Sequence, residues 1–291
     1  MVYVKHLSLP SEYAEVKLIE KEMRTCFNSM YPFKIFSIKD FYEVDFDDIT
    51  IFYGGNGSGK TTLLNILAEK ILSNRHSDFN NSPFFKQFTE MSRVEYRKPM
   101  KGSQVLTSDD VFDYVLNIRE LNEEVDSKRD QLLEKYEQTH RQYKLDHSIM
   151  HLNGLEDYER WKETRDIIYK KVSQSRYVKE RLDKNVDMFS NGETAMKYFT
   201  DMIGEDSLYL MDEPENSLSV EYQIELAKYI TASARHFRCQ FVIATHSPIF
   251  LSLSNARIYN LDEYPVCRQK WTELPNVRKY FEFFMSHKDE F

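Results

Sequence analysis

The sequence has no apolar run approaching the roughly 20 residues that a helix needs to cross a bilayer. Its first residues lack the basic segment, apolar stretch and cleavage site of a secretory signal. The three cysteines, Cys26, Cys239 and Cys267, are odd in number and far apart, which fits neither a disulfide framework nor paired metal ligands. We therefore expect buried thiols in a cytoplasmic protein that does not insert into a membrane.

Basic residues are also fewer than acidic ones. The 291 residues hold 39 lysines and arginines against 47 aspartates and glutamates, for a net charge of -8. This argues against a protein that coats nucleic acid through its overall field, although it allows a local basic patch. A hydrophobic content of 41% suffices for one good core with a sizeable insertion, or for two modest domains.

The first part of the chain predicts strands, a glycine-rich turn and a helix in succession. Leucines at helical spacing after the glycines predict a helix over 60–72. Polar residues separate short apolar runs, which are typical of strands. We expect strands at 33–38, 42–46, 49–53 and 104–107, with an irregular segment at 74–103.

The middle of the chain predicts a helical insertion. Residues 111–187 are dense in charges of both signs and contain almost no proline or glycine apart from Gly154. Their apolar repeat is too irregular and too short for a long coiled-coil arm. We expect a turn between two helices at 151–155.

The last part alternates strands with helices, which predicts a mostly parallel sheet. The apolar runs at 208–211 and 241–244 are bounded by polar residues, as expected for buried parallel strands. Residues 220–230 between them have helical spacing. The chain then offers edge strands at 257–261 and 266–271 and a helix at 276–285.

The strongest single pattern is Gly54-Gly55-Asn56-Gly57-Ser58-Gly59-Lys60-Thr61-Thr62, which satisfies G-x-x-x-x-G-K-[ST]. It lies between an expected strand and an expected helix, as a phosphate-binding loop must. Glycines let the loop bring backbone N–H groups against phosphate oxygens. Lys60 would reach the β- and γ-phosphates, and the Thr61 hydroxyl would be a ligand of Mg²⁺. The pattern predicts nucleoside triphosphate binding without choosing the class of P-loop protein.

A second pattern places two carboxylates at the end of an apolar strand, in Ser-Leu-Tyr-Leu-Met-Asp-Glu at 207–213. Asp212 would hold Mg²⁺ through water, and Glu213 would orient or deprotonate the attacking water. Taken singly, such a pair is as often a surface turn, because Asp and Glu are mostly exposed. The order of motifs along the chain strengthens the functional interpretation of this carboxylate pair, since FSNGE precedes the pair at 189–193 and ATHSP follows it at 244–248.

This succession of GGNGSGKTT, FSNGE, LYLMDEPENSLS and IATHSP resembles the P-loop, signature, Walker B with D-loop, and switch-histidine motifs of ABC ATPases. More narrowly, the chain is similar to stand-alone bacterial ATPases, often labelled AAA-family, that relate to DNA-repair and chromosome-structure ATPases. The resemblance covers roughly residues 31–285 and is weakest in the insertion. It implies an α/β P-loop fold of ABC type, with a mostly parallel core sheet, an N-terminal antiparallel β subdomain and a helical insertion. We accordingly expect an N-terminal lobe at 1–110, the insertion at 111–188 and a C-terminal lobe at 189–291.

The resemblance also implies roles for particular residues. Residues of the signature would contact the γ-phosphate bound to the partner copy's P-loop, so that ATP joins two copies head to tail. His246 would hydrogen-bond the γ-phosphate, although a lone histidine after a strand is more often structural. Residues 214–219 would form the D-loop at the dimer interface. The signature residues are Ser190, Asn191, Gly192 and Glu193.

Several positions depart from the transporter pattern. Asn191 stands where many transporters have glycine, Glu193 where they have glutamine, and Ser219 where their D-loop has aspartate. These departures favour the repair, chromosome-structure and defence branches over transport. Two positions stay open. The Q-loop residue is not fixed, with Gln104, Ser108 and Asp109 as candidates, and Phe41 or Tyr42 are candidates for stacking on adenine.

We thus predict an ATP-binding and ATP-hydrolysing enzyme with ATP and Mg²⁺ as ligands, in which Lys60, Glu213 and His246 are catalytic. It would act as an ATP-gated homodimer that drives or regulates a protein or nucleic-acid partner through the insertion, in DNA repair or antiphage defence. Two alternatives are the nucleotide-binding subunit of an ABC transporter and a nucleic-acid-binding module regulated by ATP. The second rests on Lys170, Lys171, Arg176, Lys179, Arg181 and Lys184, a run that is also typical of an ordinary solvated helix face.

Overall fold

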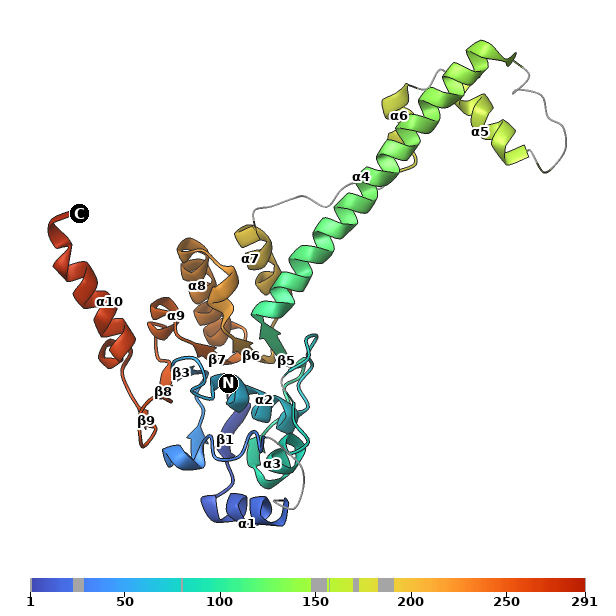
Figure 1. Cartoon of the computed structure of the whole chain (residues 1–291). Helices are drawn as coiled ribbons and strands as arrows, with labels where there is room; N and C mark the ends of the chain where they lie inside the picture. Colours follow the sequence, from blue (N-terminus) through green and yellow to red (C-terminus); the bar gives the residue numbers. More distant parts are fainter. Residues whose placement is uncertain are drawn as a thin grey trace. The chain divides into compact units, whose positions relative to one another are not determined.

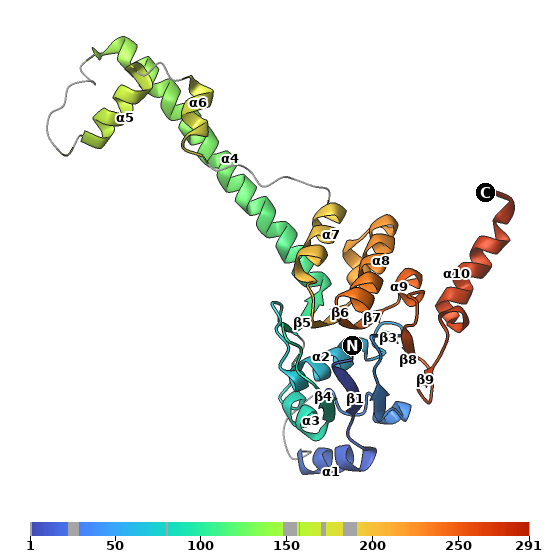
Figure 2. The ribbon, with the colours of Figure 1, turned by 180° about the vertical axis from the view of Figure 1, so that it is seen from behind.

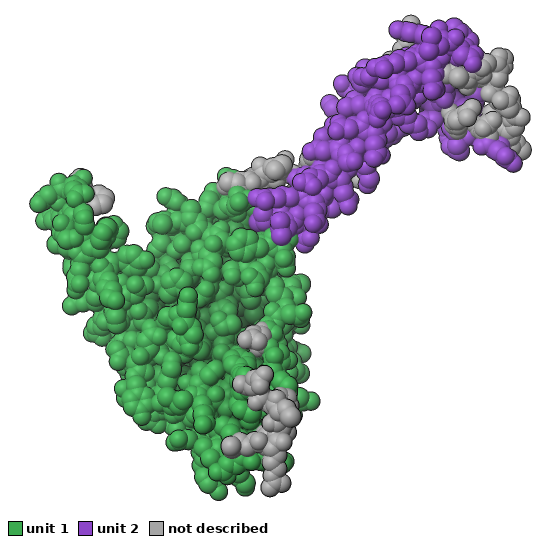
Figure 3. All heavy atoms as spheres, in the orientation of Figure 1, with its two compact units in different colours: residues 1–113, 190–291 green, residues 114–189 purple. Residues whose placement is uncertain are grey.

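The computed structural model describes residues 2–22, 29–79, 81–147, 156, 158–169, 173–182 and 191–290. The chain forms two compact units, coloured separately in Figure 3. Unit 1 comprises residues 1–113 and 190–291, and unit 2 comprises residues 114–189. Cys26, the turn expected at 151–155, Ser190, Lys170, Lys171 and Lys184 lie outside the described residues.

The centre of unit 1 is a six-stranded sheet in the order β5-β6-β7-β3-β8-β9 (Figure 1). All neighbouring strands are parallel except β8 and β9. The register brings the carboxyl ends of three strands together, because Asp212 pairs with Ala244 and Tyr53 pairs with Thr245. The strands are β3 (Ile49–Tyr53), β5 (Gly102–Thr107), β6 (Ser207–Asp212), β7 (Gln240–Thr245), β8 (Arg257–Asn260) and β9 (Cys267–Arg268).

The expected parallel strands are confirmed, and their burial explains their composition. Every residue of β3 and β7 is buried, as is every residue of β6 before Asp212, so these strands need apolar side chains on both faces. The expectation that both late strands are edge strands is wrong for β8, which lies between β3 and β9. Of these two strands, only β9 is at an edge of the sheet. Sequence could not distinguish the two because strand order is a tertiary property.

A second, antiparallel sheet of three strands has the order β2-β1-β4. β1 (Val4–Ser8) pairs with β2 (Glu43–Asp45) on one side and β4 (Arg93–Tyr96) on the other. The expected N-terminal antiparallel subdomain is confirmed. However, β1, helix α1 (Glu12–Glu22), helix α3 (Phe85–Met91) and β4 had no sequence prediction, and the last two interrupt the segment expected to be irregular.

The strand expected at 33–38 is wrong. Residues 31–36 form turns, and Ser37–Lys39 form the short 3₁₀ helix η1. Phe33 and Phe36 are both buried, and each packs edge-on or tilted against the ring of Phe88 on α3. A spacing of three residues puts both rings on one side of a turn, whereas a strand would turn them to opposite faces.

Helices cover both faces of the central sheet. α2 and the antiparallel sheet lie on one side, and α7, α8 and α9 lie on the other (Figures 1 and 2). On the first side, Phe52, Leu210 and Val242 share one core cluster with Leu63 and Leu67 of α2. Besides α1 and α3, the described helices that lie wholly in unit 1 are α2 (Lys60–Ile71), α7 (Asn191–Met202), α8 (Val220–His236), α9 (Pro248–Leu251) and α10 (Pro275–Ser286).

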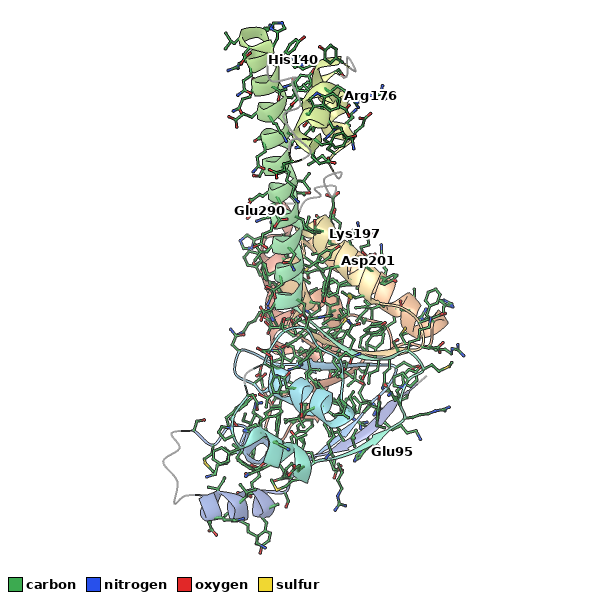
Figure 4. All side chains as sticks on the ribbon, turned by 90° about the vertical axis from the view of Figure 1, so that its right-hand side faces the viewer. Glu95, His140, Arg176, Lys197, Asp201 and Glu290 are labelled. Carbon is green, nitrogen blue, oxygen red and sulfur yellow. The ribbon has the colours of Figure 1, made fainter. Side chains whose placement is uncertain are left out.

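Unit 2 packs α5 (Tyr158–Tyr169) and α6 (Gln174–Lys179) against the later part of α4 (Ser108–Leu145), a single helix of 38 residues. The side chains of Lys135 and Glu163 form an ion pair at 2.6 Å, and those of Tyr143 and Tyr169 lie 3.4 Å apart, so α5 advances in the same direction as α4. His140 on α4 and Arg176 on α6 mark this region in Figure 4. Its small core centres on Ile167, Tyr177 and Val178.

Two further expectations concern burial and membranes. Cys239 is buried as expected, but Cys267 on the edge strand β9 is only half-buried. In the described ranges, no helix is both long and apolar enough to span a bilayer.

Candidate nucleotide site

The P-loop joins β3 to α2, as its sequence predicted. Gly59 adopts φ 103°, a left-handed conformation that favours glycine, directly before the first residue of α2. A Cβ at Gly59 would also lie 2.9 Å from Cγ2 of Ile35, so the position excludes larger residues on two grounds. The loop therefore directs the N-terminus of α2, with its unsatisfied N–H groups, towards the ends of β6 and β7.

Lys60 is folded back over this loop. Its side chain is only 4% exposed, and its ammonium donates to the backbone oxygens of Gly54 at 2.9 Å and Gly55 at 3.1 Å. The same nitrogen lies 3.4 Å from Oε1 of Glu213. A buried ammonium held by carbonyl groups is a fixed positive charge inside the concave side of the loop, where a phosphate would lie.

Two residues that sequence reasoning missed hold the P-loop from outside. Lys39 donates to the backbone oxygens of Ser58 at 2.7 Å and Leu261 at 2.6 Å, and burial lowers the pKa of Lys39. The carboxylate of Asp262 accepts the Gly55 N–H, with distances of 2.9 and 3.1 Å to its two oxygens. Both contacts tie the loop to the end of β8. The available signal was the position of Asp262 just after a strand, but only the strand order shows that this strand neighbours β3.

Asp212 ends β6 and faces the start of α2. Its Oδ1 accepts a hydrogen bond of 3.2 Å from the hydroxyl of Thr61. Burial raises the pKa of Asp212 to about 6, the neighbouring Glu213 carboxylate adds to the effect, and the Thr61 hydrogen bond opposes it. The structure thus brings together the two residues predicted to be on the metal side of the site.

Glu213 occupies a strained backbone position. Its φ of 46° places a residue with a full side chain in the left-handed region, and its N–H donates to Ala244 at 2.9 Å. This turn aims the carboxylate back across the strand ends. Oε1 lies 3.8 Å from Nδ1 of His246, and Oε2 accepts from the Asn216 amide at 3.0 Å. The predicted carboxylate and the predicted histidine are therefore neighbours, although 33 positions separate them along the chain.

Glu215 is the main residue at this site that sequence reasoning did not single out. It lies in the 3₁₀ turn η4 (Pro214–Ser217) and is 7% exposed. Its Oε1 accepts from the Thr245 hydroxyl at 2.6 Å, the His246 N–H at 2.9 Å and the Ser247 N–H at 3.2 Å. One carboxylate oxygen thereby fixes the backbone that carries His246.

Three of the four predicted signature residues lie in the part of the chain that the structure describes. Asn191, Gly192 and Glu193 form the first turn of α7, with Asn191 and Glu193 exposed. A Cβ at Gly192 would lie 2.8 Å from the ring of Tyr222 on α8, so close packing requires glycine there.

Two of the five open candidates, Gln104 and Phe41, lie away from the nucleotide site. Gln104 lies inside β5 opposite Tyr209, with its amide nitrogen 3.6 Å from the Met202 sulfur, whereas Thr107 is the β5 residue that pairs with Asp212. Gln104 is therefore not at the strand end. Phe41 is 3% exposed and packs against Phe36, so its ring is part of the core.

The family model described as "AAA domain, putative AbiEii toxin, Type IV TA system" matches residues 49–252. The chain belongs to this family. As a member of this AAA-domain family with the motif order above, it is a P-loop ATPase of the ABC class, which confirms the resemblance and the fold class predicted from sequence.

The comparison with curated proteins gives no match. Among solved structures, this AAA-domain chain is similar to an Smc head domain with an extended coiled coil from Pyrococcus furiosus, crystallised with the C-terminal domain of ScpA. Identity is 14%, coverage is 99% of this chain and 100% of that chain, and the TM-score is 0.40. It is also similar to the SMC head domain of Thermotoga maritima, with 12% identity, coverage of 92% and 99%, and a TM-score of 0.40. A nucleotide-free ATP-binding cassette from an ABC transporter matches with 13% identity, coverage of 82% and 90%, and a TM-score of 0.38.

The residues of the site fit a nucleotide with a divalent cation. A hydroxyl from Thr61 and a carboxylate from Asp212 are oxygen donors of the kind Mg²⁺ prefers, and Mg²⁺ usually takes few protein ligands beside phosphate and water. Within the described residues, the Ser58 hydroxyl is buried in the P-loop without a hydrogen-bond partner. Such a group is expected to find its partner in a bound ligand.

Proposed function

We propose that this chain binds ATP with Mg²⁺ at the P-loop, hydrolyses it, and works as a head-to-tail pair in which the signature turn of one copy completes the site of the other. The observation that carries the proposal is the meeting of Lys60, Thr61, Asp212, Glu213 and His246 at adjoining strand ends. A carboxylate, a histidine and an ammonium at these distances can act together on one phosphate.

Each residue has a distinct role in this proposal. Within residues 54–62, N–H groups other than that of Gly55, which Asp262 accepts, bind phosphate oxygens, and Lys60 leaves its carbonyl partners to contact the β- and γ-phosphates. Thr61 and Asp212 hold Mg²⁺, which neutralises phosphate charge when it is bound. Once Lys60 binds phosphate, Glu213 is released to accept a proton from the attacking water.

His246 would donate a hydrogen bond to the γ-phosphate. Its side chain is 44% exposed, so it is reachable, and its backbone is held by Glu215. As the resemblance to ABC ATPases implies, the proposal assigns Ser190, Asn191, Gly192 and Glu193 to the γ-phosphate of the partner copy's nucleotide. Asn191 and Glu193 are exposed at the start of α7, where helix N–H groups favour an anion.

The proposal is tested by Glu213→Gln, which keeps the shape of the side chain and removes its basicity. We expect the turnover number to fall by at least about 100-fold. We also expect ATP with Mg²⁺ to convert the variant into a particle of twice its nucleotide-free mass, measured by size-exclusion chromatography with light scattering. Glu225→Gln, on the exposed surface of α8, is the matched control. If saturating ATP and Mg²⁺ leave the mass of the Glu213→Gln protein unchanged, the paired mechanism fails.

Head-to-tail geometry has its own test. Lys60→Ala and Asn191→Arg should each abolish hydrolysis, and a mixture of the two proteins should recover part of it. In a mixed pair, one site combines an intact P-loop with an intact signature turn. A mixture as inactive as its components would argue that both elements act within one copy.

The output of the cycle is proposed to drive or regulate a partner, in DNA repair or in antiphage defence. The family's description refers to toxin–antitoxin systems, which supports control of an effector by this chain. The nucleic-acid alternative gains no support from the described part of its basic run. Arg176 pairs with Glu180 at 2.8 Å, and Arg181 lies over the Tyr177 ring at 4.3 Å, so both serve contacts within unit 2.

A further inference from the structure

Helix α10 exposes apolar side chains on every side. Beyond its first turn, all residues from Arg278 to Ser286 are exposed. In both ribbon views α10 stands apart from α8 (Figures 1 and 2). Its exposed apolar residues are Tyr280 at 49%, Phe281 at 58%, Phe283 at 57%, Phe284 at 52% and Met285 at 50%.

Such a helix is unfavourable in water. Burying one large apolar side chain contributes roughly 1.5–3 kcal/mol, and a surface helix normally keeps a polar face towards solvent. A cluster of exposed aromatic residues generally marks an interaction site. The physical question is what covers α10.

The base of α10 contains a pocket that would receive an apolar side chain. The pocket has a volume of about 320 Å³ and lies between α10, α9 and the 3₁₀ helix η5 (Trp271–Glu273). Its lining is predominantly apolar and includes Pro248, Trp271, Val277, Tyr280 and Phe281. Phe281 is thus both an exposed residue of the helix and a wall of the pocket.

The charges of α10 select the direction of a matching helix. Arg278 and Lys279 lie near its start, and Glu282 lies three residues after Lys279. A second α10 in the antiparallel direction can bring Glu282 of each copy near Lys279 of the other. A parallel helix would place like charges together, which is destabilising.

We propose that α10 is a self-association surface and that its occupant is the α10 of a second copy of this chain, packed antiparallel. A two-fold axis at Phe281 puts Met285, four residues later, opposite Val277, four residues earlier. Met285 of each copy then enters the partner copy's pocket, and its flexible thioether suits an irregular apolar space. Glu282 comes beside the partner copy's Lys279. The interface is isologous, so both pockets are filled at once.

This surface is separate from the proposed ATP-dependent interface, since it uses neither the P-loop nor the signature turn. Pairing through α10 needs no nucleotide. A chain with two independent two-fold interfaces forms tetramers or larger assemblies when both are engaged. ATP is therefore expected to double the mass of a particle that is already a dimer.

The test compares Met285→Asp with Met100→Asp in the full-length protein without nucleotide. Both methionines are exposed, at 50% and 87%, so neither substitution disturbs a packed core. Sedimentation equilibrium should give the wild type twice the chain mass of 34.8 kDa. Met285→Asp should raise the dissociation constant by more than about tenfold, as expected for losing one buried apolar contact, while Met100→Asp leaves it unchanged. A monomeric wild type, or equal effects of the two variants, overturns the proposal.

Exchanging the charges at positions 279 and 282 distinguishes pairing with a second copy from binding of any other partner. Lys279→Glu and Glu282→Lys should each weaken self-association, and the double variant should restore it. Failure of the double variant to restore it overturns the antiparallel arrangement. The Lys60→Ala protein should dimerise like the wild type, so failure of the ATP mechanism and failure of the α10 pairing give different results. A monomer that instead binds lipid vesicles through Met285 also overturns the proposal.

Discussion

At the scale of single residues, the site depends on carboxylates held in unlike environments. Asp212 is half-buried and has a raised pKa, whereas Glu213 is partly exposed in a strained turn, and Glu215 is buried among three donors. Their roles differ accordingly. Asp212 is suited to a cation, Glu213 to a proton, and Glu215 to positioning the backbone of residues 245–247.

Replacing Glu215 tests its positioning role. Glu215→Ala leaves the Thr245 hydroxyl and the N–H groups of His246 and Ser247 without their acceptor, so the histidine loop should shift. Small displacements of a positioned group cost up to about 100-fold in rate. We expect the turnover number to fall about 10- to 100-fold while the KM for ATP changes less than about threefold.

Glu215→Gln, which keeps an acceptor oxygen, should be less impaired than Glu215→Ala. Glu221→Ala at the exposed start of α8 is the control. A Glu215→Ala enzyme with the wild-type turnover number would show that the histidine loop holds its position without this carboxylate.

At the scale of elements, β1 and β2 are joined by a titratable contact. Nδ1 of His6 lies 2.7 Å from Oδ1 of Asp45, and its other ring nitrogen contacts Glu43. The hydrogen bond to Asp45 raises the pKa of His6, burial opposes this shift, and the contact with Glu43 adds to it. The protonated imidazole therefore stabilises the antiparallel sheet.

This contact predicts a pH dependence of stability. Because the pKa of His6 is higher in the folded protein, its contribution is fully present below its ordinary pKa of about 6.5. It is lost as the pH rises through the folded pKa. His6→Gln should lower the melting temperature most at pH 5.5 and progressively less towards pH 8.5.

Thermal unfolding of wild type and His6→Gln across this range provides the measurement, with the exposed His236→Gln as control. A wild-type advantage that grows with pH would contradict the assigned direction of the pKa shift.

At the scale of the whole molecule, the two units have separate cores. The core of unit 2 depends heavily on Tyr177, which is 1% exposed, stacks near Tyr136 at 5.5 Å and donates to Glu163 at 3.2 Å. Burial raises the pKa of Tyr177 to about 12, and the nearby Glu163 carboxylate adds to this shift. Few other side chains are available to compensate for its loss.

Tyr177→Ala should therefore loosen unit 2 alone. A large aromatic side chain removed from a core costs about 3 kcal/mol or more, so amides of α5 and α6 should exchange with deuterium at least about 100-fold faster. Amides of β3 and β7 in unit 1 should keep their wild-type rates. Tyr177→Phe retains the ring and should show a much smaller effect. Equal acceleration in both units would mean that they unfold together.

Local sequence patterns were sufficient to predict much of this structure. The P-loop, the helix after it, the buried strands β3, β6 and β7, and the candidate carboxylates Asp212 and Glu213 follow from short-range spacing and from order along the chain. The candidate His246 came from the resemblance to ABC ATPases. Glycine requirements, apolar runs and strand-end carboxylates are local properties, so a sequence displays them directly.

Other features depended on contacts between distant segments. Strand order placed β8 inside the sheet and brought Asp262 to Gly55, and packing against α3 made residues 31–39 turns rather than a strand. Lys39 and Glu215 form hydrogen bonds to backbone groups that lie far from them along the chain. Sequence alone fixes which groups can donate and accept, whereas the tertiary structure decides which of them meet, because that depends on long-range packing.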